Sequence, residues 1–225
     1  MAKENFVIAV DGFSSCGKST VAKALANALN FVFVDSGAMY RAVTLYFLRH
    51  DVDLQDSHAV SRALSQIQID FIPHPEGADI LLNGEDVSKE IRQMHISDKV
   101  SEVSTIKEVR TAMVAQQQLL GSRRNIVMDG RDIGTTVFPQ ADLKIFMTAD
   151  PEVRAMRRYA ELIDKGQQIS LEEVRQNLAH RDHIDSTREE SPLRQAEDAI
   201  VLDNSTLNQE EQLRFVMKEY LKRKR

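Results

Sequence analysis

The chain has 225 residues, of which 42% are hydrophobic, 28% are charged and 6% are aromatic, with no tryptophan. This composition excludes collagenous, low-complexity and wholly disordered proteins, and the length suffices for one sizeable core or two modest ones. The formal net charge of −5 argues against a protein that coats duplex nucleic acid by charge alone. An acidic substrate would therefore need a local cluster of basic residues.

Cysteine usage and hydropathy bear on the compartment. The single cysteine, Cys16, permits no intramolecular disulfide, and the sequence has no Cys/His cluster with zinc-ligand spacing. The apolar run at residues 6–10 is too short for the core of a signal peptide, and no stretch approaches the ~20 apolar residues that cross a bilayer. We therefore expect a cytoplasmic protein with neither membrane nor nucleic-acid partners.

The beginning of the chain predicts alternating strands and helices. Residues 6–10 form a continuous apolar run rich in β-branched residues, which is typical of a strand buried on both faces of a parallel sheet. Residues 18–29 place apolar side chains at helical spacing. A second β-rich run at residues 31–34 follows closely, and the next helix is expected to end near residue 48.

The pattern changes between residues 56 and 105. A helix-like stretch precedes short strand-like runs at residues 69–72 and 80–82, and Asn83-Gly84 then favours a tight hairpin turn. These features predict a small β-containing insertion in an otherwise alternating chain.

Alternation resumes after the insertion. The expected elements are a helix at 106–120, strands at 125–128 and 143–147, a long charged helical stretch from 151 to about 190, a strand at 199–202 and a helix at 209–222. Repeated strands and helices of this kind predict a three-layer α/β domain with a mainly parallel central sheet.

Residues 12–19 read GFSSCGKS and match the phosphate-binding loop pattern G-x-x-x-x-G-K-[ST]. Glycines let such a loop bend so that main-chain N–H groups point at phosphates, and the following helix end favours the anion. Lys18 can reach the β- and γ-phosphates of ATP, and the Ser19 hydroxyl can bind Mg²⁺. The residues predicted to bind ATP here are Gly12, Phe13, Ser14, Ser15, Cys16, Gly17, Lys18, Ser19 and Thr20.

Two positions in or beside this loop have alternative interpretations. Cys16 lies near a positive helix end that would favour a thiolate, but it has no resolving cysteine, so we interpret it as a variable loop position. Asp129 follows an apolar strand and is predicted to bind Mg²⁺ together with Ser19. Alternatively, Asp129 braces the turn that follows it.

A phosphate-binding loop alone does not separate a kinase from a switch or a motor, so a second anion site must decide. Arginine recognises phosphate through two parallel hydrogen bonds, and the chain offers Arg41, Arg110, Arg131, Arg154, Arg157, Arg158, Arg181 and Arg188. Loops after parallel strands gather at one sheet edge, so we expect Ser36, Arg41, Arg131 and Asp132 to converge near the phosphate-binding loop. That convergence would form a receiver for a second phosphate compound.

Three further segments carry a resemblance to a known family. They are DSGAMYR at residues 35–41, DGRDIGTTVFP at 129–139 and RDHIDSTR at 181–188. Together with the phosphate-binding loop they resemble the signature segments of bacterial cytidylate kinases, in the same order and spacing and over essentially the whole chain. Ile184 departs from this pattern, because relatives can carry a basic residue there.

The resemblance implies a domain organisation. A core would comprise residues 1–55 and 106–225, and residues 56–105 would form the domain that binds the nucleoside monophosphate. Residues from about 150 to 191 would form a mobile helical lid. We expect a monomer.

The resemblance also implies transfer of the γ-phosphoryl group of ATP to CMP or dCMP, giving CDP or dCDP and ADP, in pyrimidine nucleotide metabolism. It places Ser36, Arg41, Arg131 and Arg188 around the acceptor phosphate, Ser101, Arg110 and Asp132 at the cytosine, Tyr40 near the nucleotide, and Arg181 with Asp185 at the sugar. Lys18, Arg131 and Arg188 are the predicted catalytic residues. Asp132 can accept a hydrogen bond from the cytosine amino group, which uracil lacks.

The arginines at the start of the lid leave alternatives open. Helical spacing puts Arg154 on one face with Arg157 or with Arg158, from which they can approach the transferred phosphoryl group. We assign Arg157 and Arg158 to donor binding. A solvated face that pairs with Glu152, Glu161 and Asp164 explains the same spacing.

Two rival functions remain at this point. One is a kinase for another small acceptor, such as UMP or a hydroxylated metabolite. The other is a nucleotide-dependent switch or RNA-binding module that holds ATP without transferring it. The arginine-rich segments and the negative net charge count against the second rival. The six histidines have no acid or nucleophile at a diagnostic interval, so none is assigned a catalytic role.

Overall fold

The computed structural model describes residues 5–74 and 77–224. At its centre lies a five-stranded sheet with the order β2-β6-β1-β7-β8, in which every neighbouring pair is parallel. The strands are β1 (Val7–Gly12), β2 (Val32–Asp35), β6 (Ile126–Gly130), β7 (Leu143–Thr148) and β8 (Ile200–Asp203). Strands β1 and β6 are buried along their whole length, which explains the continuous apolar runs in the sequence.

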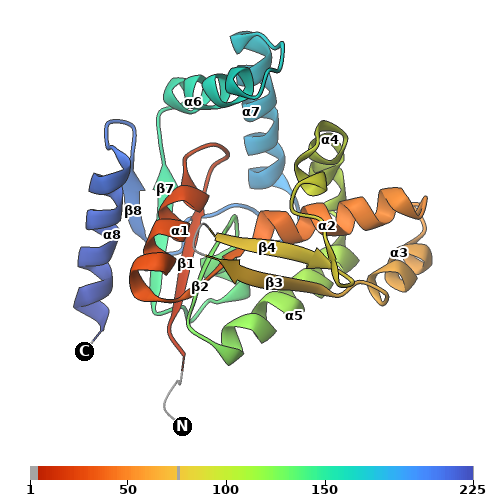
Figure 1. Cartoon of the computed structure of the whole chain (residues 1–225), viewed down its shortest axis with the longest axis horizontal. Coiled ribbons are helices and arrows are strands. Elements are labelled where there is room, and N and C mark those ends of the chain that lie inside the picture. Colours follow the sequence, from red (N-terminus) through yellow and green to blue (C-terminus); the bar gives the residue numbers. More distant parts are fainter. Residues whose placement is uncertain (1–4, 75–76, 225) are drawn as a thin grey trace.

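Helices cover both faces of this sheet (Figure 1). Successive side chains of β1 alternate between two hydrophobic clusters, with Val7 and Ala9 in one and Ile8 and Val10 in the other. The first cluster includes α2 (Ser36–Arg49) and α5 (Lys107–Arg123), and the second includes α1 (Lys18–Leu29) and α8 (Gln209–Arg223). The predicted three-layer α/β class with a mainly parallel sheet is confirmed.

The segment between α2 and α5 contains a three-stranded antiparallel sheet. Its elements are α3 (Ser57–Leu64), β3 (Ile69–His74), β4 (Gly77–Leu82), β5 (Glu85–Asp86), a short 3₁₀ turn at Glu90–Arg92, and α4 (Met94–Val103). Asn83 and Gly84 both have positive φ, as a tight hairpin turn requires, so that turn prediction is confirmed. The segment shares the hydrophobic cluster of α2 and α5 instead of having one of its own. The domain boundaries expected at residues 56–105 stay a prediction.

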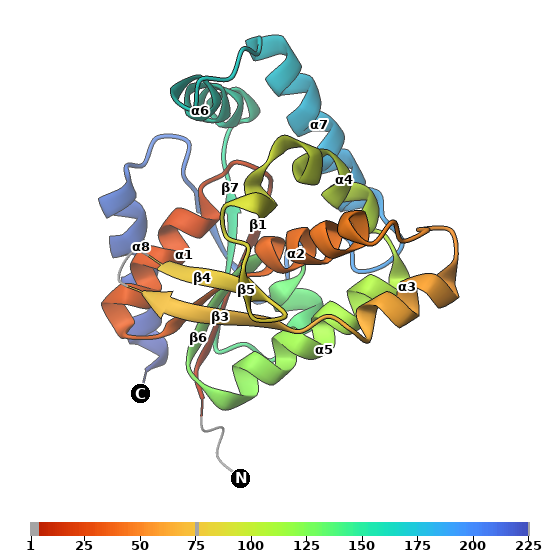
Figure 2. The ribbon, with the colours of Figure 1, turned by 45° about the vertical axis from the view of Figure 1, so that its right-hand side comes forward.

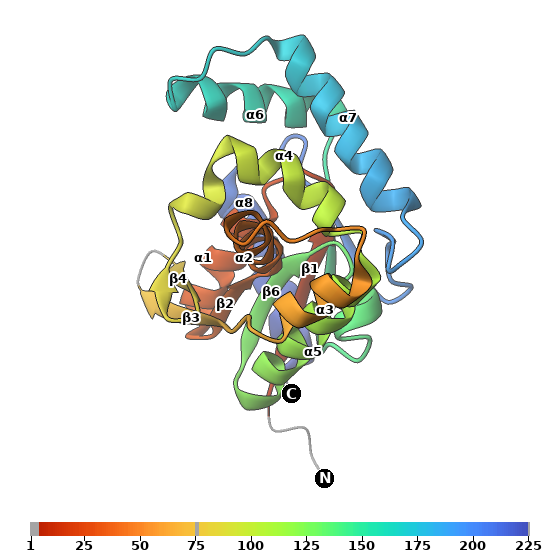
Figure 3. The same ribbon diagram turned by 90° about the vertical axis from the view of Figure 1, so that its right-hand side faces the viewer.

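The charged stretch after β7 forms two helices, α6 (Pro151–Asp164) and α7 (Leu171–Thr187), that pack on each other beyond the end of the sheet (Figures 2 and 3). Asp150 caps α6 ahead of a proline at its first position, and Ser170 and Glu173 form a capping box for α7. Gly166, with a φ of 75°, ends the first helix. The pair has a small hydrophobic cluster of its own, centred on Ala155, Leu162, Val174 and Leu178. Among the described residues, no helix is both long and apolar enough to span a bilayer.

Packing of α1 against the sheet leads to a first prediction. Leu25 is completely buried in the cluster beneath α1 and α8, so Leu25→Ala should lower the free energy of unfolding by about 2–5 kcal/mol through lost burial and a residual cavity. Leu221→Ala is the matched control, because this α8 side chain is 63% exposed and its loss should cost less than about 0.5 kcal/mol. Urea denaturation of both variants measures the difference, and equal losses would contradict this account of the core.

Candidate active site

The phosphate-binding loop connects β1 to α1 through backbone that only glycine adopts easily. Gly12 has a φ of 149°, and a Cβ atom there would lie 2.0 Å from the carbonyl oxygen of Met147 on the neighbouring strand. Gly17 has a φ of 84° and is the N-cap of α1, so no side chain there occupies the first N–H groups of the helix. These N–H groups and the helix dipole make the loop a site for a phosphate anion.

Lys18 and Cys16 are both folded into this loop. The Lys18 Nζ atom donates a hydrogen bond of 2.7 Å to the carbonyl oxygen of Phe13 and lies 3.9 Å from the Cys16 sulfur. Burial lowers the pKa of Lys18, and the nearby charge of Arg131 lowers it further. The Cys16 thiol is fully buried and donates to the Phe13 carbonyl oxygen over 3.0 Å. The Lys18 side chain thus lies buried beside the helix end.

A cleft of about 500 Å³ opens where the loops that follow β1, β2 and β6 meet. It brings together most of the residues that the sequence singled out: Ser14, Ser15, Gly17, Lys18, Ser19, Thr20, Ser36, Tyr40, Arg41, Ser101, Arg110, Asp129, Arg131, Asp132, Arg158, Arg181, Asp185 and Arg188. The candidate residues outside its lining are Gly12, Phe13, Cys16, Arg154 and Arg157. The expected convergence of Ser36, Arg41, Arg131 and Asp132 near the phosphate-binding loop is therefore observed.

Ser19 and Asp129 face each other in this cleft. The Ser19 hydroxyl donates a 2.6 Å hydrogen bond to Asp129 Oδ2, while the buried Oδ1 atom of Asp129 has no hydrogen-bond partner in the described part of the chain. Burial raises the pKa of Asp129 to about 7, and the nearby carboxylate of Asp35 adds to the effect. A cation bound here would satisfy the free oxygen and restore the charged form of the carboxyl.

Ser19 and Asp129 suit Mg²⁺ better than a metal ion whose ligands all come from the protein. Within residues 5–74 and 77–224, no group of three or more His, Cys, Asp or Glu side chains could hold a metal ion. Mg²⁺ commonly takes only one or two protein ligands and fills its remaining positions with water and phosphate oxygens. The pair of Ser19 and Asp129 supplies such a partial ligand set.

Arginines crowd the side of the cleft that faces the phosphate-binding loop. Burial lowers the pKa of Arg41, and the charges of Arg131, Arg92 and Arg158 lower it further although Asp35 opposes them. Burial likewise lowers the pKa of Arg181 to about 10, with added repulsion from Arg131 and Arg41. Nearby carboxylates do not balance all of the positive charge of these arginines. A doubly charged phosphate group in the cleft would balance more of it.

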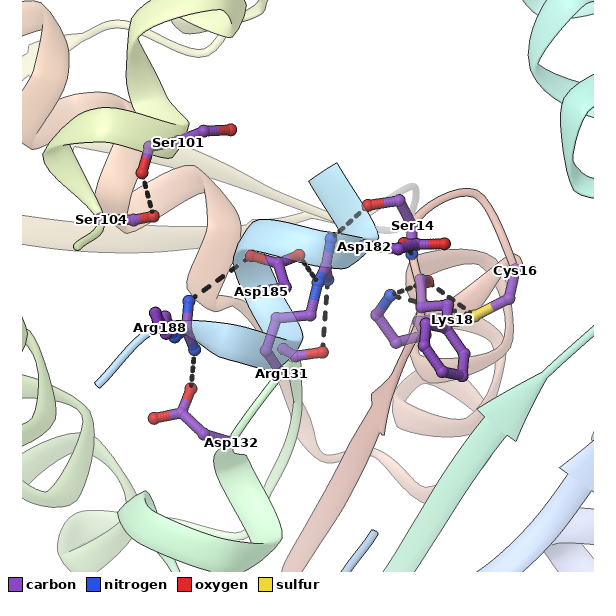
Figure 4. A network of polar contacts seen from close by, with 12 residues as sticks. Ser14, Cys16, Lys18, Ser101, Ser104, Arg131, Asp132, Asp182, Asp185 and Arg188 are labelled. Atoms are coloured by element: carbon purple, nitrogen blue, oxygen red, sulfur yellow. Dashed lines mark hydrogen bonds and ion pairs between the residues drawn. The ribbon is translucent and has the colours of Figure 1, made fainter. Parts of the chain in front are cut away.

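Ion pairs among Asp132, Arg188, Asp185 and Arg131, followed by a hydrogen bond to Ser14, reach the phosphate-binding loop (Figure 4). Arg131 donates from Nε to Asp185 over 2.6 Å and from Nη2 to the Ser14 hydroxyl over 2.9 Å. Arg188 lies 3.5 Å from both Asp185 and Asp132. Burial opposes the charge of Arg131, but the pair with Asp185 outweighs it and keeps the pKa of Arg131 above its usual value.

The far end of the cleft holds the residues that the sequence analysis expects to contact the cytosine ring. Arg110 is buried and forms an ion pair with Asp132, and its guanidinium lies 5.5 Å from the centre of the Tyr40 ring. Arg110 also donates to the carbonyl oxygen of Ser104, whose hydroxyl donates to the carbonyl oxygen of Ser101. Burial raises the pKa of Tyr40 to about 12, so its hydroxyl stays protonated and the side chain neutral. Hydrogen-bond acceptors, hydrogen-bond donors and an aromatic ring thus lie in the same part of the cleft.

The three arginines of α6 differ from one another. Arg158 lines the cleft and pairs with Glu161 at 2.8 Å, and its assignment to donor binding stays a prediction. Arg157 donates to the side-chain and main-chain oxygens of Asn204, which in turn donates to the carbonyl oxygen of Cys16. Arg154 neither lines the cleft nor faces solvent: it is buried and pairs with Asp182 at 2.5 Å. Helical spacing could not reveal that partner, because Asp182 lies on another helix.

Sequence reasoning also missed Asp11 at the end of β1. Its carboxylate accepts hydrogen bonds of 2.8 and 2.7 Å from the main-chain N–H groups of Ile133 and Gly134. These residues begin a single π-helical turn, Ile133–Val137, directly after Arg131 and Asp132. Asp11 therefore fixes the loop that carries Arg131 and Asp132 to the start of the phosphate-binding loop. The only signal in the sequence is a carboxylate at a strand end, immediately before that loop.

Comparison with known proteins identifies the family. The family model for cytidylate kinase matches residues 8–222. The chain belongs to the cytidylate kinase family. A cytidylate kinase of Bacteroides thetaiotaomicron is 52% identical over 222 residues, which cover 96% of this chain and 97% of that protein. A cytidylate kinase of Cytophaga hutchinsonii is 50% identical over 216 residues, which cover 95% of this chain and 92% of that protein.

These matches confirm the resemblance indicated by the sequence motifs. Among solved structures, an uncharacterized protein from Eubacterium ventriosum aligns with a TM-score of 0.56 at 10% identity, over 98% of this chain and all of that one. That likeness concerns the fold alone.

Asp11 leads to a prediction about pH. Burial raises its pKa to about 6 from 3.8, although the N–H groups of Gly134 and Ile133 act to lower it. Its stabilising contribution is therefore complete below pH 4 and is lost as the pH rises through 6. The free energy of unfolding of the parent protein minus that of Asp11→Asn should fall by up to about 3 kcal/mol between pH 4 and pH 7. Urea denaturation of both proteins across this range tests it, and a difference that is independent of pH would refute it.

Proposed function

We propose that the protein transfers the γ-phosphoryl group of ATP to CMP or dCMP, forming CDP or dCDP and ADP. The observation that carries this proposal is one cleft in which a phosphate-binding loop faces the guanidinium groups of Arg41, Arg131, Arg181 and Arg188. A switch that only holds ATP needs no such second anion site. Membership of the cytidylate kinase family supports CMP and dCMP as the acceptors.

The donor side of the reaction would use the loop and its buried cation. Main-chain N–H groups between Gly12 and Lys18 hold the phosphates, and Lys18 Nζ exchanges its bond to the Phe13 carbonyl oxygen for a phosphate oxygen. Ser19 and Asp129 would hold Mg²⁺, which supplies neutralisation of phosphate charge when bound. The remaining loop residues of the donor site are Phe13, Ser14, Ser15, Cys16, Gly17 and Thr20.

The acceptor side would use the arginine cluster. Arg41, Arg131 and Arg188, with the hydroxyl of Ser36, hold the acceptor phosphate and neutralise its charge, so that an acceptor oxygen can approach the donor phosphorus. That oxygen is already anionic at neutral pH, so the reaction needs no dedicated general base. Rate acceleration then comes from positioning and charge stabilisation, with Lys18, Arg131 and Arg188 as the catalytic residues.

Base and sugar would be recognised at the far end of the cleft. Asp132 accepts from the cytosine amino group, and Arg110 and Ser101 donate to the ring acceptors. Tyr40 packs beside the nucleotide, and Arg181 with Asp185 holds the sugar. Uracil would leave the Asp132 acceptor unmatched in a buried pocket, which is costly.

The helical pair α6–α7 would act as a lid. Closure brings Arg158 towards the donor phosphates, with Arg157 beside it, and excludes water that would otherwise hydrolyse ATP. We propose that the protein acts as a monomer. We assign the activity to the cytoplasm, with small nucleotides as its only partners.

A coupled assay for ADP across several acceptors at fixed ATP tests this proposal. CMP and dCMP should give the highest kcat/KM, and UMP a lower one. A higher value for UMP or for a hydroxylated metabolite would overturn the choice of acceptor. Binding of ATP without formation of any nucleoside diphosphate would favour a switch.

Replacing Lys18 tests the donor site. Lys18→Ala removes the buried cation beside the loop, so kcat should fall by about 100- to 1000-fold, the size of effect seen when a preorganised transition-state donor is removed. Lys99→Ala is the control, because Lys99 is an exposed residue of α4 that pairs only with Glu102 among the described residues. Steady-state kinetics with circular dichroism to verify folding give the result, and unchanged kcat in Lys18→Ala would reject its role.

Replacing Asp132 tests base recognition. Asp132→Asn keeps the shape of the side chain but adds an amide donor that can face the uracil O4 atom, so the ratio of kcat/KM for CMP to that for UMP should fall by about 10- to 100-fold. Asp53→Asn, in an exposed loop, is the control and should keep the parent ratio. If Asp132→Asn slowed both acceptors equally, Asp132 would not be the group that reads the base.

A further inference from the structure

Two residues at the base of the helical pair hold the main chain of the phosphate-binding loop. Asp182, near the end of α7, accepts a 3.2 Å hydrogen bond from the N–H group of Ser14. Arg154, in the first turns of α6, donates a 3.1 Å hydrogen bond to the carbonyl oxygen of the same residue. Arg154 and Asp182 pair with each other at 2.5 Å. The start of α6 and the end of α7 therefore both bind the main chain of Ser14.

The surroundings of Arg154 make this contact well defined. Its side chain is buried, and its Nε atom donates to the carbonyl oxygen of Ala149 over 3.2 Å. The guanidinium also lies 5.3 Å from the centre of the Phe13 ring. A planar guanidinium with several fixed donors holds one orientation, so it sets the direction of the Ser14 carbonyl group.

Ser14 passes this constraint to the acceptor side. Its hydroxyl accepts a 2.9 Å hydrogen bond from Nη2 of Arg131, whose Nε atom is fixed by Asp185 (Figure 4). The N–H, carbonyl and hydroxyl groups of Ser14 thus bind Asp182, Arg154 and Arg131 respectively. One loop residue connects the lid, the donor loop and an arginine that we assign to the acceptor phosphate.

We propose that Arg154 and Asp182 are positioning residues for phosphoryl transfer: by clamping Ser14 they fix the donor loop and orient Arg131 towards the acceptor phosphate. This inference rests on the proposed function. Neither residue touches the reacting atoms, and their effect is transmitted through Ser14. Misplacement of a positioning group by about 1 Å can slow a reaction by about 100-fold.

The competing interpretation is that the pair only joins two helices. The chain provides a control for it, because Glu152 and Arg175 form a second ion pair between α6 and α7 at 2.6 Å. Both side chains are exposed, and within the described residues their hydrogen bonds stay on these two helices. Arg175→Gln therefore weakens the connection between the helices without touching the loop.

The test uses a double variant that avoids a buried unpaired charge. Arg154→Met/Asp182→Leu removes both charges together, whereas Asp182→Asn alone leaves Arg154 buried without its ionic partner. We expect the double variant to unfold at a temperature close to that of the parent, with kcat for CMP about 100-fold lower. Arg175→Gln should keep kcat within about 2-fold of the parent, as expected for an exposed ion pair. Amide hydrogen exchange of the intact chain should be faster at residues 13–15 in the double variant alone.

Three outcomes would overturn the inference. They are a parent-like kcat in the double variant, an equal loss of kcat in Arg175→Gln, and a change confined to KM. Should the double variant fail to fold, Ser14→Ala tests the same connection by removing only the hydroxyl that binds Arg131. It should lower kcat and raise the KM for CMP, and parent-like kinetics would refute the link.

Failure of the proposed function would be distinguishable. It would appear as absence of CDP formation by the parent protein in the same assay. The exchange and unfolding measurements would then still report on the clamp.

Discussion

Burial of several guanidinium groups in one cleft, where they also repel one another, is the constraint around which the site is built. Burial and neighbouring positive charge both act against Arg41 and Arg181, whose pKa values are lowered as a result. Asp185 relieves part of this repulsion through its pair with Arg131, and that pair lowers the pKa of Asp185 although burial acts in the opposite direction. The carboxylates hold the arginines in place without matching all of their charge. A phosphate group in this cleft would meet guanidinium groups whose charge is only partly matched by carboxylates.

The parallel sheet places the two halves of this site together. Strand β6 lies between β1 and β2, with Asp129 in register with both Val10 and Asp35, so the loops that follow these three strands leave the sheet at one edge. Donor and acceptor residues that lie more than 100 positions apart in the sequence therefore meet in one cleft. Asp11 strengthens this arrangement, because its carboxylate ties the end of β1 to the loop that carries Arg131 and Asp132. The sheet register and the contacts of Asp11 thus hold the phosphate-binding loop next to the loop of Arg131 and Asp132.

Features with a local physical cause could be predicted from the sequence. Continuous apolar runs predicted the central strands, and the glycines and lysine of residues 12–19 predicted the phosphate-binding loop. Both features depend on residues that are neighbours in the sequence. Helix α4 was missed: it lacks a side-chain N-cap, and its apolar residues Ile96, Val100 and Val103 lie within a segment that reads as β-rich. The partner of Arg154 could not be predicted either, because only tertiary packing brings α7 against the first turns of α6.

The α6–α7 pair makes contacts of two kinds, buried and exposed. Ala155, Leu162, Val174 and Leu178 form a cluster separate from the two clusters of the sheet, so α6 and α7 hold each other without depending on the main core. The ion pairs further from the sheet, Lys165 with Glu161 and Arg175 with Glu152, are exposed and contribute little to stability. At the base, the buried pair of Arg154 and Asp182 binds the phosphate-binding loop directly. The α6–α7 pair is thus attached to the phosphate-binding loop at one end by buried contacts, while its other end carries exposed ion pairs.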